Sequence, residues 1–272
     1  MGVNAALIGC VGDDLFGKMG LSDLEYNKVD ITHMSIQKNK KSNFCICVTE
    51  SEVDGKEFIS KPGDFDDIGI DELNEELFKS VRLMHVALIT PAVAKACDIV
   101  HRYDGMVSID ANYYREYAYN YYDKIDIFIG SELYYNSFCE DKNLDKSDFK
   151  GNMQIIMSYG PKIVIFTFGA DGCRGVYSDR YFEIPSFKVS VADTTGAGDV
   201  FHGAFDAFYL MGYDVEECAK MASGVSAIKC THPGGRSGIP TFDVLEKYLQ
   251  TGKIDYTEID ERVAHYKNGI KL

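Results

Sequence analysis

Apolar residues recur along the chain in runs and at helical spacings that predict alternating strands and helices. Near-continuous apolar runs, typical of strands buried on both faces of a sheet, lie at residues 83–89, 106–109, 125–129 and 162–168. Between and after these runs, apolar residues at intervals of three and four predict amphipathic helices. We therefore expect an α/β fold with a doubly wound, mainly parallel sheet.

The N-terminal part has a different pattern. Residues 4–11 form a short apolar run that predicts a strand, and a helix is predicted to begin near Phe16. Residues 43–50 and 56–60 are strand-like and are joined by an acidic turn that contains Asp54 and Gly55. This arrangement is typical of a β-hairpin, and the lysines before it fit a solvated edge strand.

One stretch, at residues 193–199, reads Asp-Thr-Thr-Gly-Ala-Gly-Asp and precedes a run with apolar residues at helical spacing. A glycine-rich turn therefore opens a helix, and the amides of Gly196, Ala197 and Gly198 lie at its positive end, which favours an anion such as phosphate. Asp199 is either an acid favoured by the helix dipole or a general base beside this anion hole.

Two further polar residues follow a predicted strand. Asp110 and Asn112 come after the run at residues 106–109, and ligands bind outside the carboxyl ends of parallel strands. They are candidates for substrate binding, with turn formation as an equal alternative. The tyrosine-rich segment at residues 113–122 is interpreted as amphipathic surface cover without a function.

Composition limits the classes of function. The 272 residues carry a formal net charge of −14, which argues against a sequence-independent nucleic-acid binder. The eight cysteines form no CxxC pair, so we expect reduced thiols and a cytoplasmic protein. No signal-peptide pattern and no apolar run of membrane-spanning length is present, so no membrane partner is expected.

The glycine-rich stretch resembles the C-terminal signature of the ribokinase/PfkB carbohydrate kinases, and the likeness continues through Val200, Phe201, His202 and Gly203. A second match is the segment Val-Gly-Asp-Asp-Leu-Phe-Gly at residues 11–17. The resemblance implies ATP-dependent phosphorylation of a sugar hydroxyl, with Asp199 as base and residues 196–198 as anion hole. Residues 131–132 and 233–240 are similar to the sulfofructose-kinase-like branch.

The resemblance also implies roles for other residues. Many family members hold the Mg²⁺–nucleotide complex with an Asn-x-x-Glu, whereas this chain has Ser131 and Tyr134 there, so Glu132 is the candidate substitute. Asp193 and Thr195 are expected around a monovalent cation such as K⁺. The residues expected to contact ATP are Thr167, Gly169, Asp171 and Gly172 in a phosphate and ribose loop, and Ser223 near the adenine.

In the family, the region of the hairpin supplies a β lid, which is often shared with a second subunit. We therefore expect a lid at residues 31–61, a kinase domain at residues 1–30 and 62–272, and a homodimer formed through the lid. Family members begin with a strand and a Gly-Gly substrate loop, and this chain is expected to lack that segment. A nucleoside kinase of the same superfamily, or a non-catalytic relative that binds nucleotide or sugar, remain alternatives.

Overall fold

The computed structural model of the chain describes residues 1–49 and 56–269. The chain divides into two compact units. The larger contains Leu73–Asp260 together with Met1, and the smaller contains Gly2–Glu72 and the residues from Glu261 onward. Each unit has β-sheets of its own.

A six-stranded sheet forms the centre of the larger unit. Its strands are β5 (Leu83–Val86), β6 (Met106–Ala111), β7 (Ile127–Ser131), β8 (Ile163–Thr167), β9 (Cys173–Tyr177) and β10 (Arg180–Ile184). They lie in the order β10-β9-β8-β7-β6-β5; β5 to β8 are parallel, and β9 and β10 form an antiparallel hairpin at one edge. The predicted mainly parallel α/β sheet is thus confirmed.

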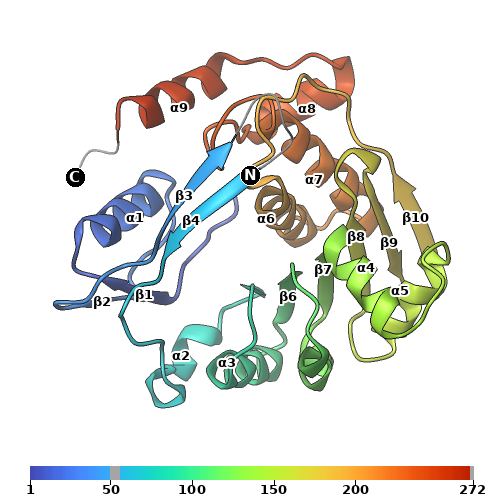
Figure 1. The fold of residues 1–272 in the computed structure, drawn as a ribbon, viewed down its shortest axis with the longest axis horizontal. Coiled ribbons are helices and arrows are strands. Elements are labelled where there is room, and N and C mark those ends of the chain that lie inside the picture. The colour runs from blue at the N-terminus through green and yellow to red at the C-terminus, as the bar shows by residue number, and fades with distance from the viewer. Residues whose placement is uncertain (50–55, 270–272) are drawn as a thin grey trace. The chain divides into compact units, whose positions relative to one another are not determined.

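Helices cover both faces of this sheet (Figure 1). The elements are α2 (Glu75–Phe78), α3 (Pro91–Arg102), η2 (Glu116–Lys124), α4 (Glu132–Asp141), α5 (Phe149–Met157), η3 (Gly169–Asp171), α6 (Ala197–Leu210), α7 (Val215–Lys229) and α8 (Phe242–Thr251). The chain steps from β5 to β8 in one direction, and right-handed crossovers put α3, α4 and α5 on the same face. Helices α6 and α7 pack against each other on the opposite face, where α6 contacts β5 and β6.

The core lies between these layers. Val107, Ile127, Phe128 and Val164 are fully buried on the strands, as the near-continuous apolar runs predicted. Tyr122 is 1% exposed, and its ring packs against Phe128. The interpretation of the tyrosine-rich segment as surface cover is therefore wrong at Tyr122, because this side chain fills the space beneath η2.

Two short sheets and a helix make up most of the smaller unit. Its elements are β1 (Gly9–Gly12), α1 (Leu15–Tyr26), β2 (Met34–Gln37), β3 (Phe44–Thr49), β4 (Lys56–Lys61) and η1 (Ile70–Glu72), and α9 (Thr257–Lys267) crosses into it from the larger unit. Strands β1 and β2 are parallel, and β3 and β4 form the predicted antiparallel hairpin. The predicted turn at Asp54 and Gly55 lies outside the described residues.

Two predicted elements differ in extent. Residues 4–11 were expected to form a strand, but the ladder covers only Gly9–Gly12, with a single bridge from Ala6 to Asp30. Residues 71–80 have the pattern of one short amphipathic helix, but they form η1 and α2 instead. The side chain of Asn74 accepts a hydrogen bond from the amide of Glu76, and this cap starts α2 as a separate helix. Within residues 1–49 and 56–269, no helix combines the length and apolar character of a membrane span.

Candidate active site

The glycine-rich turn leads into the N-terminus of α6, as predicted. Gly196 has a φ of +74° and caps the helix, and a Cβ at this position would lie 3.0 Å from the carbonyl oxygen of Gly235. The amide of Ala197 donates to the carbonyl of Thr194 at 3.1 Å. No described residue accepts a hydrogen bond from the amides of Gly196 and Gly198. Two main-chain donors are therefore available at the positive end of the helix.

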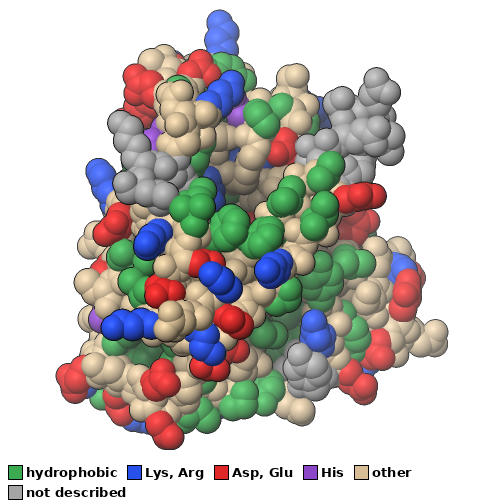
Figure 2. Space-filling view, turned by 60° about the vertical axis from the view of Figure 1, so that its left-hand side comes forward, with side chains coloured by type: hydrophobic (Ala, Val, Ile, Leu, Met, Phe, Trp, Pro, Cys, Tyr) green, Lys and Arg blue, Asp and Glu red, His purple; other side chains and the backbone are tan. Residues whose placement is uncertain are grey.

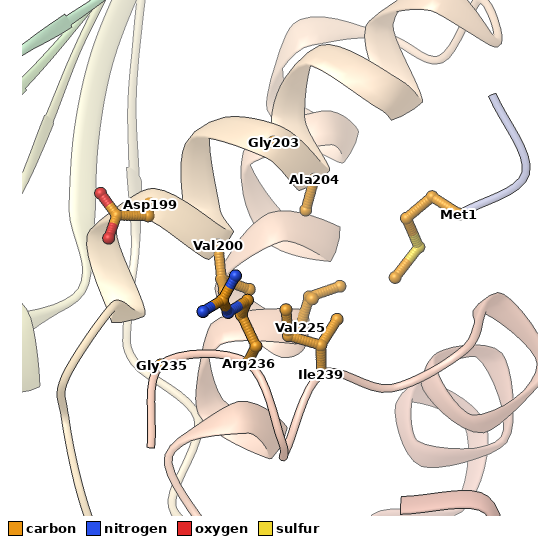
Figure 3. A pocket seen from close by; sticks show the side chains of 9 residues that line it. All are labelled: Met1, Asp199, Val200, Gly203, Ala204, Val225, Gly235, Arg236 and Ile239. Atoms are coloured by element: carbon orange, nitrogen blue, oxygen red, sulfur yellow. The ribbon is translucent and has the colours of Figure 1, made fainter. Parts of the chain in front are cut away.

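Asp199 lies in the first turn of α6, and its side chain is exposed. It lines a cavity of about 440 Å³ together with Gly235 and Arg236. Figure 3 shows its carboxylate pointing away from the apolar side chains of Val225 and Ile239 in this cavity. No described residue donates a hydrogen bond to the carboxylate of Asp199, so both oxygens are available as acceptors.

The carboxylate of Asp193 holds the turn before α6. Its Oδ1 accepts hydrogen bonds from the amide and the hydroxyl of Thr195, at 2.8 and 2.7 Å, and its Oδ2 accepts one from the amide of Gly234 at 2.8 Å. Burial by itself raises the pKa of Asp193, but these hydrogen bonds and the charge of Lys229 outweigh it and lower the pKa. Asp193 and Thr195 therefore fix the geometry from which α6 begins.

The expected nucleotide loop and Ser223 lie near each other in the larger unit. Thr167, at the end of β8, pairs in register with Cys173 on β9. The Oγ of Ser223 on α7 lies 3.7 Å from the Sγ of Cys173 and also donates to the carbonyl of Ala219 at 2.9 Å. The loop between Thr167 and Cys173 bends at Gly169 and Gly172, whose φ angles are +54° and +87°, while Asp171 is exposed in η3.

Residues at the ends of β6 and β7 lie beside this loop. Asp110 and Asn112 line a cavity of about 250 Å³ together with Arg115. The hydroxyl of Ser131 donates to the carbonyl of Asn112 at 3.0 Å and also accepts from the amide of Tyr134, so it caps α4. Glu132 is therefore the first residue of α4, and it is exposed. The candidate polar residues thus lie at the carboxyl ends of the neighbouring strands β6 and β7.

Comparison with known proteins decides the family. The model of the pfkB family carbohydrate kinases matches residues 1–242. The chain belongs to the pfkB family of carbohydrate kinases. It is 28% identical over 247 residues to an uncharacterized sugar kinase of Archaeoglobus fulgidus, covering 88% of this chain and 96% of that protein. It is 24% identical over 271 residues to an ATP-dependent 6-phosphofructokinase of Thermoanaerobacterium thermosaccharolyticum, covering 93% of this chain and 82% of that protein.

The fold of the kinase is also that of solved structures. A putative ribokinase II from E. coli, crystallised in complex with ATP and Mg²⁺, superposes with a TM-score of 0.79 at 23% sequence identity, covering 92% of this chain and 84% of that chain. This likeness confirms the expected ribokinase-like fold. The chain is accordingly a phosphotransferase with an alcohol group as acceptor, as the family assignment states.

Sequence reasoning missed a partly buried polar network in the kinase. The Nδ1 of His85 on β5 lies 2.8 Å from the Oδ2 of Asp206 on α6, and the Nε2 of His202 on α6 lies 3.3 Å from the Oδ1 of Asp110. Burial by itself raises the pKa of Asp110, but the hydrogen bond and charge of His202 and the charge of His85 lower it. The available signal was the spacing of His202 and Asp206, which lie four residues apart and share one face of α6.

Lys229 was missed as well. It is the last residue of α7 and is fully buried. Its Nζ donates to the main-chain carbonyls of Asp193, at 2.9 Å, and of Thr195. In the sequence it resembled an ordinary basic residue at a helix C-terminus, because nothing local distinguishes a lysine that folds inward.

Proposed function

We propose that this carbohydrate kinase uses Asp199 as the base that accepts the proton of a sugar hydroxyl during transfer of the γ-phosphoryl group of ATP. The observation that carries the proposal is an exposed carboxylate one turn from two main-chain amides that no described residue uses. A base and an anion hole at one helix terminus are the two groups that phosphoryl transfer to an alcohol needs.

In the proposed reaction, the sugar oxygen forms a bond to the γ-phosphorus while its proton passes to Asp199. The bond between the γ-phosphorus and the oxygen that bridges to ADP breaks, and that oxygen leaves with its electron pair. The amides of Gly196 and Gly198 stabilise the negative charge on the transferred group. The amide of Ala197 would join them by exchanging its hydrogen bond to Thr194.

ATP is proposed to bind along the loop at residues 167–172, with Ser223 near the adenine. The E. coli structure with bound ATP and Mg²⁺ supports a nucleotide site in this fold. Thr167, Gly169, Asp171 and Gly172 would contact phosphates and ribose. Glu132 would meet the Mg²⁺ of Mg·ATP, since its exposed carboxylate fits the oxygen ligands that this ion prefers.

The sugar is proposed to lie near Asp110 and Asn112. Asp110 lies near the carboxyl end of β6 and Asn112 directly follows this strand. His202 links Asp110 to the helix that carries Asp199. The similarity to the sulfofructose-kinase-like branch makes sulfosugars part of the substrate class to be assayed. A cytoplasmic location goes with this proposal because all eight cysteines are free thiols.

We propose residues 31–61 as the lid segment, and a homodimer formed through its hairpin. Cross-strand neighbours Ile46 and Ile59 are 52% and 60% exposed, and apolar surface of this kind marks interaction sites. On the face drawn in Figure 2, hydrophobic side chains reach the surface among charged ones.

The test is an Asp199→Asn variant assayed with ATP over a panel of sugars, sulfosugars and nucleosides. The substitution keeps the shape of the side chain but removes its basicity, so we expect kcat to fall about 10²–10⁴-fold with an unchanged unfolding midpoint. Asp243→Asn is the matched control, because Asp243 is also an exposed acid in the first turn of a helix.

These assays also separate the alternative functions. Wild-type turnover in Asp199→Asn would remove the base assignment. A wild-type chain that forms no product with any member of the panel would instead indicate a non-catalytic relative, and a preference for nucleosides would indicate a nucleoside kinase.

A further inference from the structure

The turn before α6 is built around a buried ammonium group. Lys229 has no exposed surface, and within the described residues no other lysine or arginine is buried. Its Nζ donates to the carbonyl of Asp193 at 2.9 Å and to the carbonyl of Thr195. Burying a charge is costly unless it is paired with polar groups. The two carbonyls therefore offset the cost of burying the ammonium of Lys229.

The two carbonyls belong to the turn whose side chains were expected to surround K⁺. Two carbonyl oxygens that converge on one point repel each other unless a positive charge lies between them. The carboxylate of Asp193 is also used, since Thr195 and Gly234 donate three hydrogen bonds to it. The oxygens of Asp193 and Thr195 therefore already have a cation, which is attached to the chain, and the residues present do not fit a potassium ion at this point.

The main chain of Lys229 is also held in place. The amide of His232 donates to the carbonyl of Lys229 at 3.2 Å, and a Cβ at Gly238 would lie 2.4 Å from that carbonyl oxygen. The neighbouring residue Cys230 accepts hydrogen bonds from the amides of Ala192, at 2.8 Å, and Asp193, at 3.2 Å. The end of α7 and the turn before α6 are thus joined by main chain as well as by the ammonium.

We propose that Lys229 is a positioning residue that replaces a monovalent cation, so that the kinase needs no K⁺. The ammonium holds the carbonyls of Asp193 and Thr195 together, and this sets the conformation from which Gly196 begins α6. The amides of Gly196 and Gly198 are thereby oriented without a dissociable ion. The inference rests on the proposed function, because it concerns the anion hole assigned there.

The experiment compares the wild type with Lys229→Ala in K⁺, NH₄⁺ and tetramethylammonium at constant ionic strength. Two quantities are measured in each salt, namely kcat and the midpoint of thermal unfolding. Tetramethylammonium is too large to lie between two carbonyls, so it serves as the inert cation. Lys220→Ala is the matched control, because Lys220 is exposed on the same helix.

The wild type and Lys220→Ala are expected to give the same kcat and the same unfolding midpoint in all three salts. In tetramethylammonium, Lys229→Ala is expected to lose about a hundredfold in kcat, the effect of a small misplacement of catalytic groups. Because the truncated side chain leaves room for an ion, K⁺ or NH₄⁺ should restore part of the activity and raise the unfolding midpoint. A purely structural lysine would not create this response to small cations.

Two results would overturn the proposal. One is a wild-type enzyme whose kcat and unfolding midpoint both rise in K⁺ over tetramethylammonium. The other is a folded Lys229→Ala protein that responds to cations no more than the wild type does. If Lys229→Ala does not fold, the comparison of the wild type in K⁺ and tetramethylammonium decides in its place. The unfolding midpoints do not depend on phosphoryl transfer, so failure of the proposed function would be recognised separately, by absence of product in every salt.

Discussion

The Nε2 of His202 lies 3.3 Å from the Oδ1 of Asp110, which joins helix α6 to the carboxyl end of strand β6. His202 is 5% exposed, and its Nδ1 has no hydrogen-bond partner among the described residues. Three residues before it on the same helix lies Asp199. His202 therefore links the helix that carries the proposed base, Asp199, to the proposed sugar-binding residue Asp110. Movement of α6 would change the positions of both carboxylates together.

The pair formed by His85 and Asp206 predicts a pH-dependent stability. Burial by itself lowers the pKa of His85, but the hydrogen bond and charge of Asp206, with the charges of Asp110 and Asp199, raise it above 6.5. A histidine whose pKa is raised in the folded protein contributes stability below about pH 6.5. This contribution is lost as the pH rises through the pKa of the folded state. We expect the free energy of unfolding of the wild type, relative to His85→Gln, to be largest near pH 6 and to decline toward pH 8.

Urea denaturation at several pH values measures this difference. Asp206→Asn is the control, because it leaves His85 in place but removes its main charged partner. In the Asp206→Asn background, the loss of unfolding free energy between pH 6 and pH 8 that depends on His85 should be smaller. A difference between wild type and His85→Gln that stays constant, or grows, between pH 6 and 8 would show that the imidazole is not held in its charged form.

The nucleotide loop predicts unequal effects of two glycine substitutions. Gly169 and Gly172 both have positive φ angles, but a Cβ at Gly169 meets no atom within 4 Å, whereas one at Gly172 would lie 2.0 Å from the carbonyl oxygen of Ile184. Gly169→Ala should cost only the left-handed strain, about 1–2 kcal/mol. Gly172→Ala adds a clash with main chain that cannot give way, so its loss should exceed about 3 kcal/mol.

Chemical denaturation of both variants gives the comparison directly, and each variant serves as the other's control. Equal losses would mean that the main chain at Ile184, the end of β10, shifts to make room for the extra carbon atom. A larger loss at Gly169 would contradict the assignment of the tight approach to Gly172.

Local patterns predicted the elements, and long-range contacts decided much of the site. The helix starts at Thr90 and Asp214 were predictable because the capping groups lie in the first turn itself. Tyr122 and Lys229 were misjudged because residue type favours the surface, while their partners lie on other elements. The pairing of His202 with Asp110 likewise depends on the packing of α6 against β6, which no spacing in the sequence encodes.

The hairpin predicts how the kinase assembles. Ile46 and Ile59 face each other across β3 and β4 and leave more than half of their side-chain surface exposed, an apolar area that a second copy of the chain would cover. An aspartate at residue 59 would place a charge in that interface, where it would lack a partner. We therefore expect the wild type to have twice the 30.4 kDa mass of one chain by light scattering, and Ile59→Asp to have the mass of one. Ile70→Asp is the matched control, since Ile70 is a similarly exposed isoleucine in η1 of the same unit. This variant should remain dimeric. A wild type that stays monomeric at high concentration would exclude the hairpin as the interface. An Ile59→Asp variant that dimerises like Ile70→Asp would exclude it as well, because the added charge would then lie in water in both the monomer and the dimer.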